Sequence, residues 1–146
     1  MSTDTTGTAP QTAGMTPDEL RDFYRRYIEL ANNRDFDRMA EFAHDEVIMN
    51  GTPVSRDDMV AEFRRHTDAV PDLSWEVQEL LVDGTHVAAR LVDTGTPVAE
   101  WNGLAPTGAT VTFAETAFYE VVDGRFKHMW YLMDGVALQA QLTAQG

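Results

Sequence analysis

Cysteine is absent from the 146-residue chain. That absence excludes disulfide bonds, thiolate metal ligands and a cysteine nucleophile, and it fits a reducing compartment. Basic residues are scarce as well, because 11 Lys and Arg stand against 24 Asp and Glu, a formal net charge of −13. Such a surface repels phosphate backbones, so the sequence predicts a protein that does not bind nucleic acid.

Long apolar runs are also missing, and none approaches the length of a membrane span. The first residues, MSTDTTGTAPQTAG, contain neither a basic nor an apolar segment, unlike a signal peptide. We therefore expect a cytoplasmic protein without membrane insertion. The Thr, Gly, Ala and Pro of this stretch predict a disordered segment over residues 1–15, followed by one domain over residues 16–146.

Motifs of several enzyme classes are not found either. The four histidines stand on separate predicted elements without the spacing of a metal site, so we expect no metal: His44, His66, His86 and His128. A Gly-rich phosphate loop and a G-x-S-x-G elbow are both missing, which argues against a serine hydrolase.

Helix signals occupy the first half of the chain. Thr16 and Glu19 form a capping box before an apolar stripe of helical spacing that ends at Asn32-Asn33. A short second helix is predicted from Asp35, and a third from Ser55 to Pro71, with a short strand, EVIMNG, between them.

Strand signals dominate the second half. Asp83-Gly84 predicts a hairpin between SWEVQELLV and HVAARLV, and Asp123-Gly124 a second one between residues 109–122 and RFKHMWYLM. A further strand, VAEWNGL, is predicted between the hairpins, and Asp134 is expected to cap a terminal helix, GVALQAQL. Three helices followed by mostly antiparallel strands indicate an α+β fold.

The same layout resembles the SnoaL-like polyketide and ester cyclases, within the nuclear transport factor 2-like superfamily. The strings that carry the resemblance are FAHDEVIMNG, AVPDLSWEVQELLVDGTHVAARL, TGTPVAEWNGLAPTGATVTF and FYEVVDGRFKHMWYLMDGVALQAQL, within residues 17–143. The resemblance implies a cone-shaped, curved, mostly antiparallel sheet with three N-terminal helices over its concave face. It also implies a small homodimeric or tetrameric enzyme, without cofactor, that closes a ring by an acid–base step.

Three positions depart from the family pattern. The family's aspartate base falls on Tyr131, its assisting histidine on Ala117, and a polar residue of the first strand on Met49. The family mechanism therefore cannot be carried over unchanged.

Glu115 is the leading catalytic candidate. Strand alternation in VTFAETAFYEV places it on one face with Phe113, Ala117 and Tyr119. Burial there would raise its pKa toward neutrality, as a proton carrier needs. The alternative is a glutamate at a solvated rim, or one paired with Arg90.

Three further side chains could assist it. Tyr131 could donate a hydrogen bond to an enolate oxygen, His66 could transfer a proton, and Asn50 could hold a carbonyl. The alternatives are a packing tyrosine, a core histidine and a turn asparagine. The predicted pocket walls are Trp101, Phe113, Ala117, Tyr119, Met49 and Met129, although plain core explains these equally well.

The sequence thus favours a cyclase or isomerase acting by acid–base catalysis on a small, apolar, carbonyl-bearing substrate. Two alternatives stay open: a binding domain without chemistry, and an epoxide hydrolase of the same fold. His128 and Trp130 point to the opposite sheet face, which we expect to form a homodimer.

Overall fold

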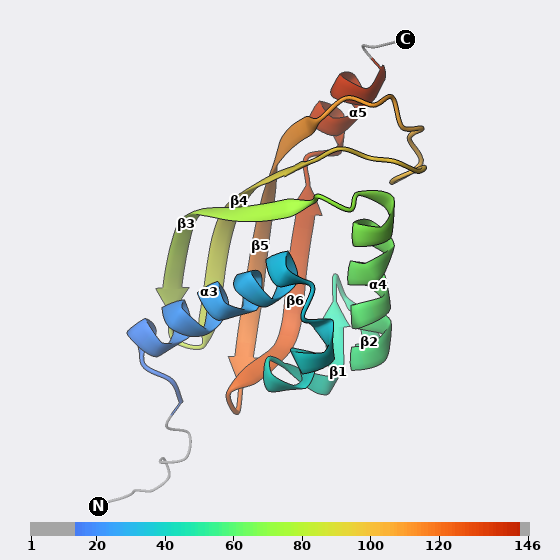
Figure 1. The fold of residues 1–146 in the computed structure, drawn as a ribbon. Helices are drawn as coiled ribbons and strands as arrows, with labels where there is room; N and C mark the ends of the chain where they lie inside the picture. The colour runs from blue at the N-terminus through green and yellow to red at the C-terminus, as the bar shows by residue number, and fades with distance from the viewer. Residues whose placement is uncertain (1–13, 144–146) are drawn as a thin grey trace, which may run out of the picture.

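Six strands form one curved sheet in the computed structural model, which describes residues 14–143 (Figure 1). The strand order is β2-β1-β6-β5-β4-β3. Only β1 and β6 pair in parallel, and every other pair is antiparallel. The strands are β1 (Ala43–Met49), β2 (Thr52–Ser55), β3 (Ser74–Asp83), β4 (His86–Gly95), β5 (Val111–Val122) and β6 (Arg125–Met133).

The helices lie mainly on the concave side of this sheet, as the family resemblance implied. Figure 1 shows α3 (Pro17–Asn33) crossing the sheet and α4 (Arg56–Ala69) standing beside β1 and β2. A 3₁₀ helix, η1 (Phe36–Glu41), connects α3 to β1, and α5 (Gly135–Thr143) follows β6. The capping box of Thr16 and Glu19 is present, and Asp134 Oδ1 accepts a hydrogen bond from the Ala137 N–H at 3.0 Å. Most of the predicted segment 1–15 lies outside the described residues.

Two Asn-Gly pairs make tight turns. Asn50 and Gly51 both have positive φ, and they join β1 to β2, a strand that the sequence analysis did not predict. Asn102 and Gly103 do the same between Trp101 and Leu104, which exchange two backbone hydrogen bonds of 2.9 Å. The predicted strand over 98–104 is therefore wrong, because its apolar residues flank a turn within a connecting segment.

A bulge in β6 changes which side chains face inward. Val121 pairs with Phe126 and Glu120 pairs with His128, so Lys127 is an extra residue on β6. Phe126 and Met129 consequently both point into the core although they are three positions apart. Beyond the bulge, Met129, Tyr131 and Met133 face the concave side, as predicted for Met129 and Tyr131.

The core lies between α3 and the sheet. Tyr27 stacks edge-on against Phe126 with ring centroids 4.8 Å apart, and Phe23 packs against both Phe42 and Phe126. Over residues 14–143, no helix combines the length and the apolar character that a membrane crossing requires. The packing fills one end of the concave side and leaves the other end to a pocket.

Candidate functional site

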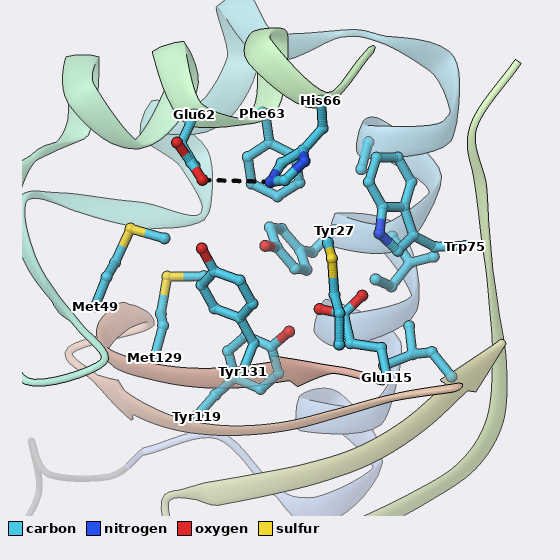
Figure 2. Close-up of a pocket in the computed structure, with 14 residues that line it drawn as sticks. Tyr27, Met49, Glu62, Phe63, His66, Trp75, Glu115, Tyr119, Met129 and Tyr131 are labelled. Atoms are coloured by element: carbon cyan, nitrogen blue, oxygen red, sulfur yellow. Dashed lines mark ion pairs between the residues drawn. The ribbon is translucent and has the colours of Figure 1, made fainter. Parts of the chain in front are cut away.

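A pocket lies between α3, α4 and the concave face of the sheet (Figure 2). Its cavity volume is about 40 Å³, so in this conformation the side chains leave room for only a few water molecules. A larger ligand requires these side chains to move apart. The lining residues are Tyr27, Ile28, Ala31, Met49, Glu62, Phe63, His66, Trp75, Leu91, Glu115, Tyr119, Met129, Tyr131 and Met133.

Glu115 forms part of the sheet wall, as its position in β5 predicted. Only 7% of its surface is exposed. Burial raises the pKa of this carboxyl group, while interactions with Asp93 and Trp75 act in the opposite direction. This burial excludes the alternative of a solvated rim. The alternative ion pair with Arg90 is not formed, because Arg90 pairs with Glu79 instead. The geometric prediction for Glu115 is confirmed, and its chemical role stays a prediction.

His66 enters the pocket from the opposite wall, on α4. The Trp101 indole N–H donates a hydrogen bond to His66 Nδ1 at 2.9 Å. Its other nitrogen, Nε2, lies 3.3 Å from Glu62 Oε2 without completing a hydrogen bond. Burial and the nearby Arg65 lower the His66 pKa, while Glu62 opposes the shift. A neutral imidazole whose Nδ1 accepts a hydrogen bond carries its proton on Nε2, so His66 presents a donor to the pocket.

We therefore expect His66 to be neutral at pH 7, with its proton on Nε2. Two-dimensional ¹⁵N spectra of the imidazole distinguish this tautomer from the Nδ1–H form and from the cation. Trp101→Phe removes the donor to Nδ1, and a mixture of tautomers should follow. An unchanged tautomer in Trp101→Phe would contradict the orienting role of the indole.

Tyr131 places its phenol between the two walls (Figure 2). Burial is the main cause that raises its pKa, so the phenol is protonated and can donate a hydrogen bond. Asn50, by contrast, does not line the pocket. Its Oδ1 accepts a hydrogen bond from the Tyr131 backbone N–H at 2.9 Å, and the residue is exposed. The prediction that Asn50 holds a carbonyl is corrected, because its side chain is already used to fix the turn.

The predicted walls divide into two groups. Tyr119, Met49 and Met129 line the pocket. Phe113, Ala117 and Trp101 are buried but do not line it, so these three are corrected from binding residues to core residues. Trp101 lies behind His66, which explains why an aromatic residue is needed there without contact to a ligand.

Asp93 is the titratable residue at this site that the sequence analysis missed. It lies on β4, and it is fully buried beside Glu115. Burial raises the pKa of Asp93, and the interaction with Glu115 raises it further. The signal was available, since Val87, Ala89, Leu91 and Asp93 alternate inward in the same way as the residues around Glu115.

Few charged side chains line the pocket. Two carboxyl groups, Glu62 and Glu115, line it, and within residues 14–143 neither Lys nor Arg does. Arg65 pairs with the Glu62 carboxylate at 2.7 Å. No three His, Asp or Glu side chains of the described chain are grouped closely enough to hold a metal ion. The arrangement combines a buried carboxyl group on the sheet with hydrogen-bond donors from His66 and Tyr131.

Comparison with known proteins gave one family match. The family model described as SnoaL-like polyketide cyclase matches residues 21–142. No curated protein matches the chain.

Several solved structures share the fold. A SnoaL-like polyketide cyclase from Agrobacterium tumefaciens is 31% identical, with a TM-score of 0.81 over 88% of this chain and 99% of that one. IdmH from Streptomyces antibioticus, provisionally assigned as a polyketide cyclase, is 26% identical, with a TM-score of 0.76 over 84% of this chain and 97% of IdmH. AclR from Streptomyces galilaeus, provisionally assigned as a hydroxylase, is 24% identical, with a TM-score of 0.76 over 88% of this chain and 98% of AclR. These neighbours share the fold, and they are named for more than one reaction.

Proposed function

This chain belongs to the SnoaL-like polyketide cyclase family, and from that premise we propose that it is a cofactor-independent cyclase or isomerase for small, apolar, carbonyl-bearing substrates. One observation carries the proposal: a buried carboxyl group, Glu115, on the wall of a largely apolar pocket. A carboxylate in such surroundings is a stronger base than one in water, because burial penalises its charge.

The proposed reaction begins with proton transfer. Glu115 takes a proton from the carbon next to a substrate carbonyl, and the electron pair of that C–H bond moves into an enolate. Hydrogen bonds from the Tyr131 phenol and from His66 Nε2 stabilise the charge on the enolate oxygen. The enolate carbon then attacks a second carbonyl of the same molecule, which closes a ring, and Glu115 returns its proton to the alkoxide that forms. In isomerisation, Glu115 instead returns the proton to the enolate at another position.

The charges of the pocket favour a neutral substrate. Glu62 is ionised, because its hydrogen bond from Arg65 lowers its pKa despite partial burial. Glu115 adds a second negative charge when it acts as a base, and within the described chain neither Lys nor Arg lines the pocket to balance a substrate carboxylate. An anionic substrate would therefore be repelled.

The test uses deuterium exchange into 2-tetralone, a flat bicyclic ketone. With protein in heavy water, exchange next to the carbonyl should exceed the buffer rate by about 100-fold or more, the usual range of general-base catalysis. Mass spectrometry of the recovered ketone measures the rate, and tryptophan fluorescence measures binding, because Trp75 lines the pocket. Binding of the ketone with exchange at the buffer rate would contradict the proposal.

The second candidate is a binding domain without chemistry. Met49 and Tyr131 occupy pocket positions where the family pattern has polar catalytic residues, and that substitution favours a pocket that holds a ligand unchanged. A small molecule that co-purifies and is recovered chemically unchanged after long incubation supports this candidate. A conversion product excludes it.

We also propose that the protein forms a homodimer through the outer face of its sheet. Four residues form one row across four strands on that face: Leu81, Ala88, Phe118 and Trp130. Phe118 is 58% and Trp130 39% exposed, and the neighbouring Leu132 is 73% exposed. Exposed apolar side chains grouped in this way are typical of interaction surfaces.

Light scattering should give twice the chain mass of 16.3 kDa. Phe118→Glu with Trp130→Glu should shift the protein to a monomer, because charges would then be buried in the interface. Val98→Glu is the matched control, since Val98 is an exposed apolar residue of the segment between β4 and β5. A wild-type monomer at micromolar concentration would refute the dimer.

A further inference from the structure

Asp93 is a buried titratable group for which the proposed reaction gives no task. It does not line the pocket, and none of its surface is exposed. In the sheet register, Asp93 pairs with Phe113 and Leu91 pairs with Glu115. The two carboxyl groups are therefore diagonal neighbours on the same face of adjacent antiparallel strands, within reach of each other.

Three oxygen atoms of this pair lack a hydrogen-bond donor among the described residues: Asp93 Oδ1, Asp93 Oδ2 and Glu115 Oε1. An ionised carboxylate only accepts hydrogen bonds, so two ionised groups cannot satisfy each other. One proton changes this, because a protonated carboxyl group donates to the ionised one. Buried polar groups without partners are costly, and sharing a proton removes much of that cost.

We infer that Asp93 is a positioning residue for Glu115: it keeps the one proton that the two carboxyl groups share and donates it as a hydrogen bond to the Glu115 carboxylate. The sharing itself stands on the geometry of β4 and β5. The positioning role rests on the proposed function, since it concerns Glu115 as a base. Paired carboxyl groups that share one proton are a known arrangement in other buried sites.

The surroundings favour a single proton on the pair. Four phenols from α3, β5 and β6 face the two carboxyl groups: Tyr24, Tyr27, Tyr119 and Tyr131. Across the pocket, the titratable side chains are the neutral His66 and the ionised Glu62. Among the groups that act on the two pKa values, none is a cation that would stabilise a doubly ionised pair.

Asp93 is the better place for the proton because Glu115 faces the pocket, where ligand or water can solvate a charge. Glu115 then remains ionised at neutral pH and ready to accept a substrate proton. When it does so, the pair becomes neutral without any change at Asp93.

The test is ¹³C NMR of the full chain with labelled Asp and Glu carboxyl carbons, titrated from pH 4 to pH 9. One Asp resonance should keep the chemical shift of a protonated carboxyl group at pH 7, and it should be missing in Asp93→Asn. If every Asp resonance has the shift of an ionised carboxylate at pH 7, the inference is overturned. The overturning result is read from the wild-type protein alone, so the test stands even if Asp93→Asn does not fold.

Two variants separate positioning from packing. Asp93→Asn keeps a donor toward Glu115, whereas Asp93→Leu keeps a similar volume without a donor. The Glu115 titration midpoint should lie at least about one pH unit higher in Asp93→Leu than in Asp93→Asn, as for directly interacting sites. The acid side of the pH profile for 2-tetralone exchange should move with it. Equal Glu115 titration midpoints in the two variants would show that a donor at position 93 has no influence on Glu115, and they would overturn the positioning role.

The two proposals fail in different ways. If Asp93 is protonated but the protein does not catalyse ketone exchange, the shared proton is supported and the proposed enzymatic function is refuted. If Asp93 is ionised and exchange still depends on Glu115, the enzymatic function is supported and the shared proton is refuted.

Discussion

Glu115→Gln should lower the rate of 2-tetralone exchange by about 100-fold or more, because an amide cannot accept the proton. The substitution preserves size and removes the charge. Glutamine also keeps an oxygen that accepts a hydrogen bond from Asp93. The expected result is therefore a folded protein that binds the ketone and exchanges it at close to the buffer rate, measured by mass spectrometry.

Glu62→Gln is the matched control for this experiment. Glu62 is the other carboxyl group of the pocket, and its hydrogen bond from Arg65 lowers its pKa, which makes it a weak base. Exchange should stay within about tenfold of wild type in this variant, a smaller loss than that of a general base. A large loss in Glu62→Gln together with a threefold loss or less in Glu115→Gln would assign the proton transfer to α4 instead of β5.

Asp93→Asn should make the protein more stable than wild type at neutral and alkaline pH. Burial raises the pKa of Asp93 in the folded state, whereas in the unfolded chain it is about 4. Between these two values the folded state binds one proton more than the unfolded state. The wild-type free energy of unfolding therefore falls as pH rises, by about 1.4 kcal/mol per pH unit for one proton. Asparagine does not titrate, so the variant escapes this loss.

Urea unfolding at pH 5, 6, 7 and 8 measures the effect. The free energies of unfolding of the two proteins should be similar near pH 5. At pH 8 the free energy of unfolding of the variant should be higher by a few kcal/mol, on the order of the slope above multiplied by three pH units. Asp72→Asn is a suitable control, because Asp72 accepts a hydrogen bond at the surface, from the Thr96 N–H. A constant difference between Asp93→Asn and wild type over this range would show that Asp93 is ionised in the folded state.

Much of this fold was readable from local patterns. The capping box at Thr16, the Asp-Gly hairpins and the alternation around Glu115 each act over a few residues, and each appears in the structure as predicted. Glu115 could be found because one polar residue interrupts an apolar strand face. The same reasoning applied to β4 would have found Asp93 two residues before Gly95.

Other features depend on contacts between distant segments. The bulge at Lys127 changes the alternation of β6, and no single strand pattern reveals it. Asn50 and Trp101 have the residue types of a carbonyl holder and a stacking wall. Their actual tasks come from partners far along the chain: the backbone of Tyr131 and the ring of His66. Pocket membership was predicted correctly for Met129 and Tyr131 on β6, for two of the four candidates on β5, and for neither Asn50 nor Trp101 in the connecting segments.

The bond between Trp101 and His66 has an evolutionary consequence. The connecting segment 96–110, which belongs to no helix or strand, determines which imidazole nitrogen carries hydrogen toward the pocket. Loss of that indole by mutation would let part of the His66 population carry its proton on Nδ1 and present a proton acceptor to the pocket, with every pocket-lining residue unchanged. Descendants of one scaffold could in this way acquire different reactions through mutations that never touch the substrate.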